Sequence, residues 1–134
     1  MLYQVNIRTG SRVDFQEITQ KVRDIVRESG VRSGVCYIFV PHTTAGVTVN
    51  EHADPSVVED IAAQFETMVP QNRNYRHLEG NAPAHIKATL VGNSEVLLIE
   101  DGTIFLGTWQ GIFFCEFDGP RNRTLLVKII PDRV

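Results

Sequence analysis

The chain has 134 residues, of which 43% are hydrophobic and 22% are charged, and its formal net charge at pH 7 is -3. Its mean hydropathy of -0.09 is typical of a globular protein and argues against a disordered or membrane-embedded chain. The basic residues are scattered, so the electrostatic footprint of a nucleic-acid-binding protein is missing. No apolar run approaches the roughly 18 residues of a membrane span and no signal peptide is recognisable, so we expect a cytoplasmic protein.

The first part of the chain predicts a strand followed by a helix. Residues 2–8 alternate between apolar and polar side chains, as in a strand. Asp14 and Glu17 have the spacing of a capping box, in which two side chains satisfy backbone N–H groups at a helix start. Apolar residues at helical spacing follow, and Gly30 is the expected end of the helix.

The next part predicts two strands and a second helix. Residues 34–40 are apolar on both alternations, which is typical of a central strand covered on both faces. Residues 46–51 alternate again and are expected to form a strand beside the first. Asp54 as N-cap and Pro55 at the first helical position begin a helix that turns its apolar side chains inward and ends before Pro70.

The remainder predicts a loop, a short helix and three strands. Residues 71–80 are polar and without periodicity, so we expect a loop of functional length. A short helix begins near Asn81, with Ile86 and Leu90 as its core contacts, and ends at Gly92. The strands are expected at residues 95–100, 108–117 and 123–130.

This order of elements predicts an α+β fold with a mostly antiparallel sheet, two main helices and one short helix, in a single compact domain spanning residues 1–134. Cys36 and Cys115 lie far apart in strand-like runs, without the CxxC spacing of zinc or redox sites. Both are therefore expected to be buried free thiols.

Polar residues gather at the joints between these elements. His42 follows the buried strand and stands beside Thr43 and Thr44, which offers a titratable imidazole next to two hydroxyls. The alternative is a turn histidine bonded to the backbone. Asn50 and Glu51 precede a helix N-terminus, where anions are favoured, and Glu51 is a candidate base or metal ligand.

A third cluster lies in and after the long loop. If the segment folds back at Gly80, His77 and His85 can meet at one divalent ion, zinc or magnesium, with His42 or Glu51 completing the ligand set. A hydrogen-bonding role for His77 without a metal is the alternative.

Two further candidates carry recognition chemistry. Trp109 is the single tryptophan of the chain, and with Gln110 and Thr108 it offers a stacking face and hydrogen-bonding groups. A tryptophan buried in the core is the alternative. Arg121 follows a turn and suits bidentate phosphate recognition, unless it is a solvated residue of a hairpin.

Five segments, in this order, resemble the motifs of the YjbQ-like family: residues 42–44, 50–54, 81–87, 102–111 and 118–121. The resemblance covers nearly the whole chain. It implies a compact α+β fold that assembles as a homotrimer, with sites near subunit interfaces. It also implies a secondary thiamine-phosphate synthase, a transferase that joins an aminopyrimidine methyl diphosphate to a thiazole phosphate and releases diphosphate.

With that activity in view, the residues take hypothetical roles. The catalytic residues are expected to be His42, Glu51, His85 and Lys87. The substrate-binding residues are expected to be Thr43, Thr44, Asn50, Thr108, Trp109, Gln110 and Arg121, and the candidate metal ligands are His42, His77 and His85. Basic groups would stabilise the leaving diphosphate, and the indole would hold the flat ring. The alternatives are a metal-assisted hydrolase of a small phosphorylated metabolite and a non-catalytic trimer that binds one.

Overall fold

The computed structural model describes residues 1–133, which form two antiparallel sheets and three helices. The strands are β1 (Leu2–Arg8), β2 (Asp14–Glu17), β3 (Gly34–Phe39), β4 (Ala45–Glu51), β5 (Ser94–Glu100), β6 (Thr103–Ile104), β7 (Gln110–Glu116) and β8 (Asn122–Pro131), and the helices are α1 (Thr19–Ser29), α2 (Pro55–Met68) and α3 (Ala82–Val91). The order of strands is β1-β8-β3-β5-β6 in one sheet and β2-β7-β4 in the other. The predicted α+β fold is therefore confirmed.

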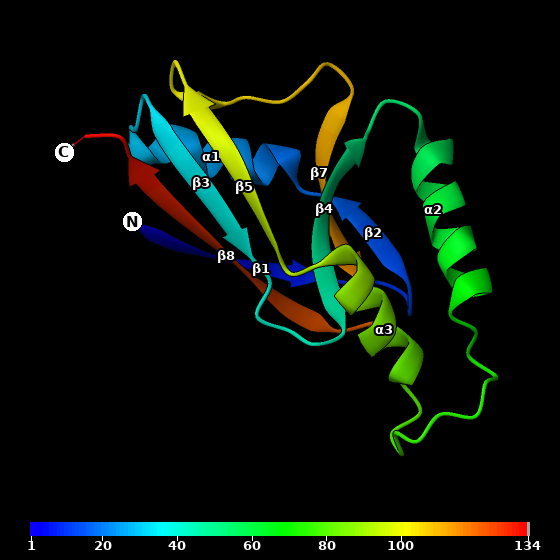
Figure 1. The fold of residues 1–134 in the computed structure, drawn as a ribbon. Helices are drawn as coiled ribbons and strands as arrows, with labels where there is room; N and C mark the ends of the chain where they lie inside the picture. Colours follow the sequence, from blue (N-terminus) through cyan, green and yellow to red (C-terminus); the bar gives the residue numbers. More distant parts are fainter. Residues whose placement is uncertain (134) are drawn as a thin grey trace.

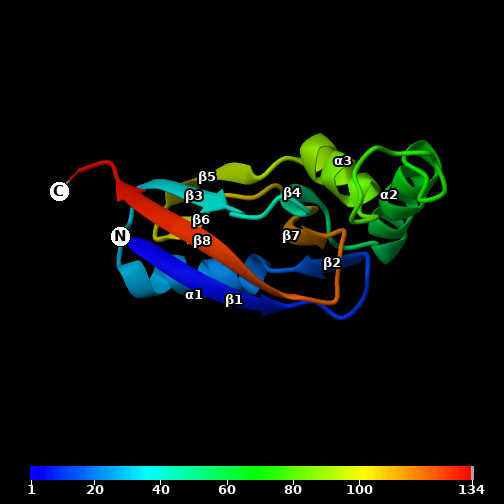
Figure 2. The same ribbon diagram turned by 90° about the horizontal axis from the view of Figure 1, so that it is seen from below.

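The main core lies between the two sheets and α1. Figure 1 shows α1 behind the five-stranded sheet, and its apolar side chains Val22, Ile25 and Val26 are buried there. Figure 2 shows α2 and α3 grouped at the other end of the molecule, beside the three-stranded sheet. A second core of small and aromatic side chains joins α3 to the outer side of β7. Every residue of β7 after Gln110 is buried, so β7 is the strand with a core on each face.

The capping box expected at Asp14 and Glu17 is wrong, because these residues form β2. β2 pairs with β7 in a register that places Phe15 opposite Cys115, which brings its ring against Phe117. The helix begins after Ile18 without a side-chain cap. The edge strand forms instead of the capping box, because partial burial of the Phe15 ring contributes more free energy than one cap.

The expectation that residues 34–40 and 46–51 form neighbouring strands is also wrong. β3 lies between β8 and β5, whereas β4 pairs with β7 in the other sheet. Tyr37 and Phe39 are each 43% exposed, so one face of β3 is uncovered in the single chain. The residues that point outward on this sheet are mostly apolar, and we call them the outer face: Val35, Tyr37, Phe39, Val96, Leu98, Leu126 and Ile130.

The start of α2 is as predicted, since Pro55 is its first residue and the Asp54 carboxylate accepts the Ser56 N–H at 3.0 Å. The inward burial expected along α2 is only partial. Val58 and Phe65 pack against the second core, but Met68 is exposed. α2 therefore contributes little to the core.

α3 presents a different face to the core than its apolar pattern predicts. Ile86 and Leu90 are exposed, whereas Ala84, Lys87 and Ala88 are buried. The two alanines pack in the second core that surrounds β7. Small side chains let the helix backbone approach the sheet closely, which the bulkier residues would prevent.

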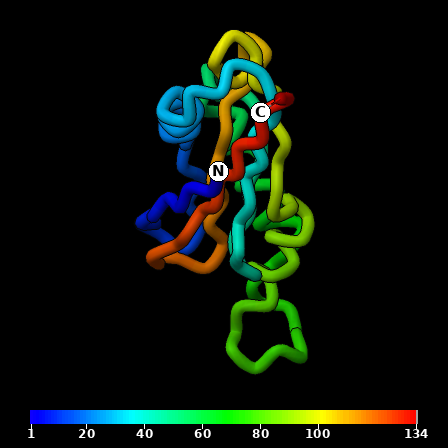
Figure 3. Tube along the Cα trace, turned by 90° about the vertical axis from the view of Figure 1, so that its left-hand side faces the viewer, coloured from blue at the N-terminus to red at the C-terminus, as the bar shows by residue number. Residues whose placement is uncertain are grey.

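Both cysteines are buried free thiols, as predicted. Burial raises the pKa of Cys36 to about 11, so this thiol stays protonated and unreactive. Across residues 1–133, no helix has the length and apolar character needed to cross a membrane. The loop between α2 and α3 extends from one end of the molecule, as the green segment of Figure 3 shows.

At Gly34, the neighbouring strands β3 and β8 lie so close that a side chain would not fit. A Cβ atom there would lie 2.2 Å from the Ile130 carbonyl oxygen and 2.9 Å from the Pro131 Cα. We expect Gly34→Ala to lower the free energy of unfolding by about 1–3 kcal/mol, measured by urea denaturation. Gly10→Ala is the matched control, because a Cβ atom at Gly10 would lie 3.9 Å from its nearest neighbour, Asp14 Oδ2. Equal stability of the two variants would contradict the close approach.

Candidate functional site

The candidate residues divide into two groups because β4 separates them. His42, Thr43 and Thr44 precede β4, whereas Asn50 and Glu51 are its last residues. Seven residues at ~3.3 Å each place the two groups roughly 20 Å apart. The antiparallel partner β7 preserves the division, since its register pairs Ala45 with Glu116 and Glu51 with Gln110.

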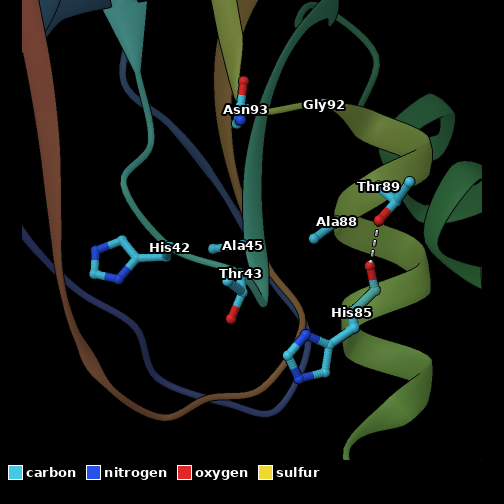
Figure 4. A pocket seen from close by; sticks show the side chains of 8 residues that line it. All are labelled: His42, Thr43, Ala45, His85, Ala88, Thr89, Gly92 and Asn93. Carbon is cyan, nitrogen blue, oxygen red and sulfur yellow. Dashed lines mark hydrogen bonds between the residues drawn. The ribbon is translucent and has the colours of Figure 1, made fainter.

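The first group lines a cleft between β4, α3 and the turn that joins β7 to β8. Two adjoining hollows, of about 480 and 310 Å³, share Thr43 and His85. In Figure 4 the Thr43 side chain lies between the imidazoles of His42 and His85. We call this the histidine cleft, and its polar lining residues are His42, Thr43, Thr44, His77, Glu79, Asn81, His85, Thr89, Asn93, Asp118, Arg121 and Arg123.

His42 is held in one tautomer by the backbone of β8. Its Nε2 atom accepts the Thr124 N–H at 2.9 Å, so the proton of the neutral ring is on Nδ1. Burial, and then the positive charge of Arg123, lower the pKa of His42 below its ordinary value. The ring is therefore neutral at pH 7 and can offer a single N–H donor.

His77 and His85 meet, as predicted, although they come from the loop and from α3. Their ring centroids are 5.2 Å apart in an edge-to-face arrangement. His77 Nε2 also lies 3.9 Å from a Glu79 carboxylate oxygen. In the part of the chain that the structure describes, no three His, Cys, Asp or Glu side chains are grouped to hold a metal ion. His42 therefore does not complete the expected ligand set, and a bound divalent ion stays a prediction.

The floor of the cleft is formed by Arg123 of β8, which is paired with the buried Glu116 of β7. Arg123 donates to both carboxylate oxygens of Glu116, from Nε at 2.8 Å and from Nη2. Nη2 also donates to the Thr44 hydroxyl at 2.7 Å. Thr9 donates its hydroxyl proton to Glu116 at 2.8 Å. Thr44, expected to bind substrate, is thus a buried member of this network.

These contacts decide the protonation of Glu116. Burial raises its pKa, but hydrogen bonds from Arg123, the Asp118 N–H and Thr9 outweigh burial and hold the pKa below its ordinary value. Glu116 is therefore ionised at neutral pH and keeps the Arg123 charge compensated.

The wall beside this floor is formed by Asp118, Asn81 and Arg121. Arg121 donates to the Asp118 carbonyl from Nε at 2.7 Å and to its carboxylate from Nη2 at 2.9 Å. The Asn81 amide donates to the same carboxylate at 2.8 Å, and Asn81 Oδ1 is buried without a partner among residues 1–133. Burial raises the pKa of Asp118, but these bonds outweigh it and lower the pKa overall.

Lys87 does not belong to the cleft. It is 1% exposed and its ammonium group donates to Glu66 of α2, which also pairs with Arg12 at 3.1 Å. The catalytic role expected for Lys87 does not fit this contact, because Glu66 occupies the ammonium group and Lys87 does not line the cleft. The structure assigns it to the contact between α2 and α3.

The second group lies at the opposite end of β4. Trp109 is 62% exposed, so the alternative of a core tryptophan is wrong. Gln110 accepts the Gly107 N–H at 2.8 Å, and Glu51 accepts the Ala53 N–H at 3.0 Å. Asn50 likewise accepts the Glu51 N–H. These polar side chains, with the exposed Thr108, shape the loops around the indole.

Sequence reasoning missed the buried ion pair beneath the cleft and a second carboxylate contact, to a histidine. Glu116 and Arg123 lie in line with the apolar core-facing residues of their strands, and opposite charges at such positions are a signal that could have found them. Glu17 and His52 form the other pair, Nδ1 to Oε2 at 2.8 Å. No local sequence pattern predicts the contact between Glu17 and His52, because only the order of the strands brings the two residues together.

The family model described as UPF0047 protein YjbQ-like matches residues 3–132. The chain belongs to this family. A UPF0047 protein of Methanocaldococcus jannaschii is 52% identical over 99% of this chain and 96% of its own, and YugU of Bacillus subtilis is 46% identical over 97% and 99%.

Solved structures of UPF0047 relatives have the same fold. An uncharacterised YjbQ/UPF0047 protein of Clostridium acetobutylicum superposes with a TM-score of 0.94 at 49% identity, covering 96% of this chain and 99% of that one. A YbjQ-like protein of unknown function from Sulfolobus solfataricus gives 0.94 at 35% identity, covering 98% and 97%.

These relatives correct the expected activity. The two solved relatives are described as uncharacterised and of unknown function, and none of the descriptions of these relatives names a thiamine-phosphate synthase. The prediction of that activity is therefore wrong. The roles in diphosphate release given to Lys87 and Arg121 depended on that activity and are wrong as well.

The Glu116–Arg123 pair makes stability depend on pH. The depressed pKa of Glu116 contributes stability that is present above the pKa of about 4.3 in the unfolded chain and is lost as the pH falls through the folded value. We expect Glu116→Gln to lower the free energy of unfolding by about 3–5 kcal/mol at pH 7, because Arg123 loses its partner. The difference from the native chain should narrow below about pH 4.3. A difference that stays constant in denaturation curves from pH 3 to 7 would refute this account.

Proposed function

We propose that the histidine cleft binds a small metabolite through a phosphate or similar oxyanion group. The observation that carries the proposal is the convergence of neutral imidazole, hydroxyl and guanidinium donors on one cleft. His42 offers its Nδ1–H, Thr43 an exposed hydroxyl and Arg121 the N–H groups of Nη1. An oxyanion accepts hydrogen bonds from all of these donors, whereas an apolar ligand would leave them without partners.

Acceptor groups of the cleft add selectivity for the part of the ligand next to the phosphate. Asn81 Oδ1 is a buried acceptor at the wall of the cleft, so a ligand that carries a hydroxyl or amine donor beside its phosphate would satisfy it. Asp118 and Glu79 add negative charge that disfavours a second anionic group nearby. The favoured ligand is therefore a small phosphate monoester with a neighbouring hydroxyl or amine.

We also propose that His85 acts as an acid or base toward the bound molecule. Its side chain lies in both hollows of the cleft, beside Thr43. An imidazole exchanges protons readily near neutral pH, and the adjoining His77 ring limits how His85 can turn. His42 suits this role less, because its Nε2 atom is bonded to the backbone.

Inorganic phosphate is the probe for the cleft. We expect it to shift the imidazole NMR signals of His42 and His85 in a saturable way, in the millimolar range. Arg121→Met should weaken binding about tenfold or more, because a hydrogen bond to a charged group contributes about 1.5–3 kcal/mol.

The control is Trp109→Phe, which lies at the other end of β4 and should leave phosphate binding unchanged. The proposal is rejected if chloride at equal ionic strength produces the same shifts, or if Arg121→Met binds phosphate as the native chain does.

We further propose that copies of the chain assemble as a homotrimer through the outer face. Strand register places its apolar side chains next to one another across β5, β3 and β8, with Tyr37 opposite Val96 and Val35 opposite Leu98 and Ile130. Contiguous exposed apolar surface of this kind marks association sites. A copy of the same chain supplies a matching apolar face.

Sedimentation equilibrium tests the assembly. We expect a mass near three times 15.1 kDa for the native chain and a shift toward the monomer for Val96→Lys, because association would bury an unpaired charge. Glu59→Gln on α2 changes the net charge equally and should leave the mass unchanged. A monomeric native chain, or an unchanged mass for Val96→Lys, would count against this interface.

A further inference from the structure

At the end of β4 opposite the histidine cleft, Glu17 and His52 form a hydrogen-bonded pair. Glu17 ends β2 and His52 follows β4, and both of these strands flank β7. His52 Nδ1 lies 2.8 Å from Glu17 Oε2, and both side chains are partly exposed. The pair therefore bridges the three-stranded sheet at its surface.

The sheet beneath the pair is shaped to accept it. Gly111 of β7 lies between the two side chains, and a Cβ atom there would be 2.6 Å from His52 Cβ and 2.9 Å from Glu17 Oε2. Any side chain at this position would push the pair apart. Thr19 donates a second hydrogen bond to Glu17 Oε2 at 2.9 Å, and the His52 N–H donates to the Trp109 carbonyl at 2.9 Å. Both members are thus fixed by neighbouring elements.

The contact sets the chemistry of the imidazole. A carboxylate at Nδ1 favours the tautomer with its proton on that nitrogen, which leaves Nε2 as an acceptor. Nε2 has no partner among the residues that the structure describes. The neighbouring Trp109 exposes 62% of its surface although a folded protein usually buries much of an indole. The backbone hydrogen bond from His52 to Trp109 therefore places an acceptor without a described partner and an exposed indole on adjoining residues of two chain segments.

We propose that His52, Glu17 and Trp109 form a second ligand site, for a flat heteroaromatic ring that carries an N–H donor. The ring stacks on the indole and its N–H donates to His52 Nε2. The carboxylates of Glu17 and of Glu51, the residue before His52, disfavour an anion here. This site therefore takes a neutral ring, in contrast to the oxyanion of the histidine cleft, and is independent of it.

Trp109 is the single tryptophan of the chain, so its fluorescence reports on this site alone. The full chain is titrated with uracil, which has N–H donors, and with 1,3-dimethyluracil, which has none. Excitation at the red edge of the indole band avoids absorption by either compound. We expect saturable quenching by uracil, and binding of 1,3-dimethyluracil that is about fivefold weaker or more, because one hydrogen bond is lost.

Two variants and a control locate the contact. His52→Ala should weaken uracil binding to the level of the dimethylated compound, and Glu17→Gln should weaken it less, because the amide still accepts the Nδ1 proton. His85→Ala in the histidine cleft should leave the quenching unchanged, so failure here is distinct from failure of the phosphate site. Quenching that does not saturate, binding that is equal for both compounds, or uracil binding by His52→Ala that is as tight as that of the native chain overturns the proposal.

The tautomer provides a measurement that does not depend on the ligand. Long-range proton–nitrogen NMR spectra of the native chain should show the His52 proton on Nδ1, and Glu17→Gln, which keeps the shape of the side chain, should retain the fold. A His52 ring protonated on Nε2 in the neutral state overturns the assignment, because no acceptor would then face the ligand.

Discussion

The buried pair of Glu116 and Arg123 is the contact on which both the fold and the cleft depend. Glu116 belongs to the three-stranded sheet and Arg123 to the five-stranded sheet, so their hydrogen bonds join the two at one end of the core. The same carboxylate accepts the Thr9 hydroxyl and the Asp118 N–H, which fixes the start of the turn that carries Arg121. Because each charge is buried, neither tolerates loss of the other. Arg123, which forms the floor of the histidine cleft, is held by these hydrogen bonds.

The antiparallel pairing of β4 with β7 gives the molecule two chemically different ends. Imidazoles, a threonine hydroxyl and a guanidinium gather before β4, whereas a carboxylate–imidazole pair and an exposed indole gather after it. Hydrogen-bond donors dominate the end that holds the histidine cleft. The end that holds His52 and Trp109 offers an acceptor beside negative charge. The two proposed ligands, an oxyanion and a neutral ring with an N–H donor, match this difference. UPF0047 relatives share the fold over nearly their whole length, so the arrangement is open to test in them as well.

Features that depend on residues close together in the sequence were predicted correctly more often than features that depend on distant residues. The Asp54 cap, the loop before α3 and the meeting of His77 with His85 follow from neighbours along the chain, and the structure contains all three. Glu17 shows the opposite case, since a local capping pattern gave way to pairing with a strand about a hundred residues away. Lys87 shows it again, because its burial depends on Glu66 of another helix.

The sequence by itself determined the helices and strands in nearly every position, the buried thiols and the family, because alternation, caps and ordered motifs are local properties of the chain. Only the tertiary structure decided which polar residues share a site. Strand order sends His42 and Glu51 to opposite ends of β4 and brings Glu17 to His52 across Gly111. Strand pairing depends on the apolar surface buried over the whole core, and residues from every part of the chain contribute to it. A short stretch of sequence therefore cannot predict which strands pair.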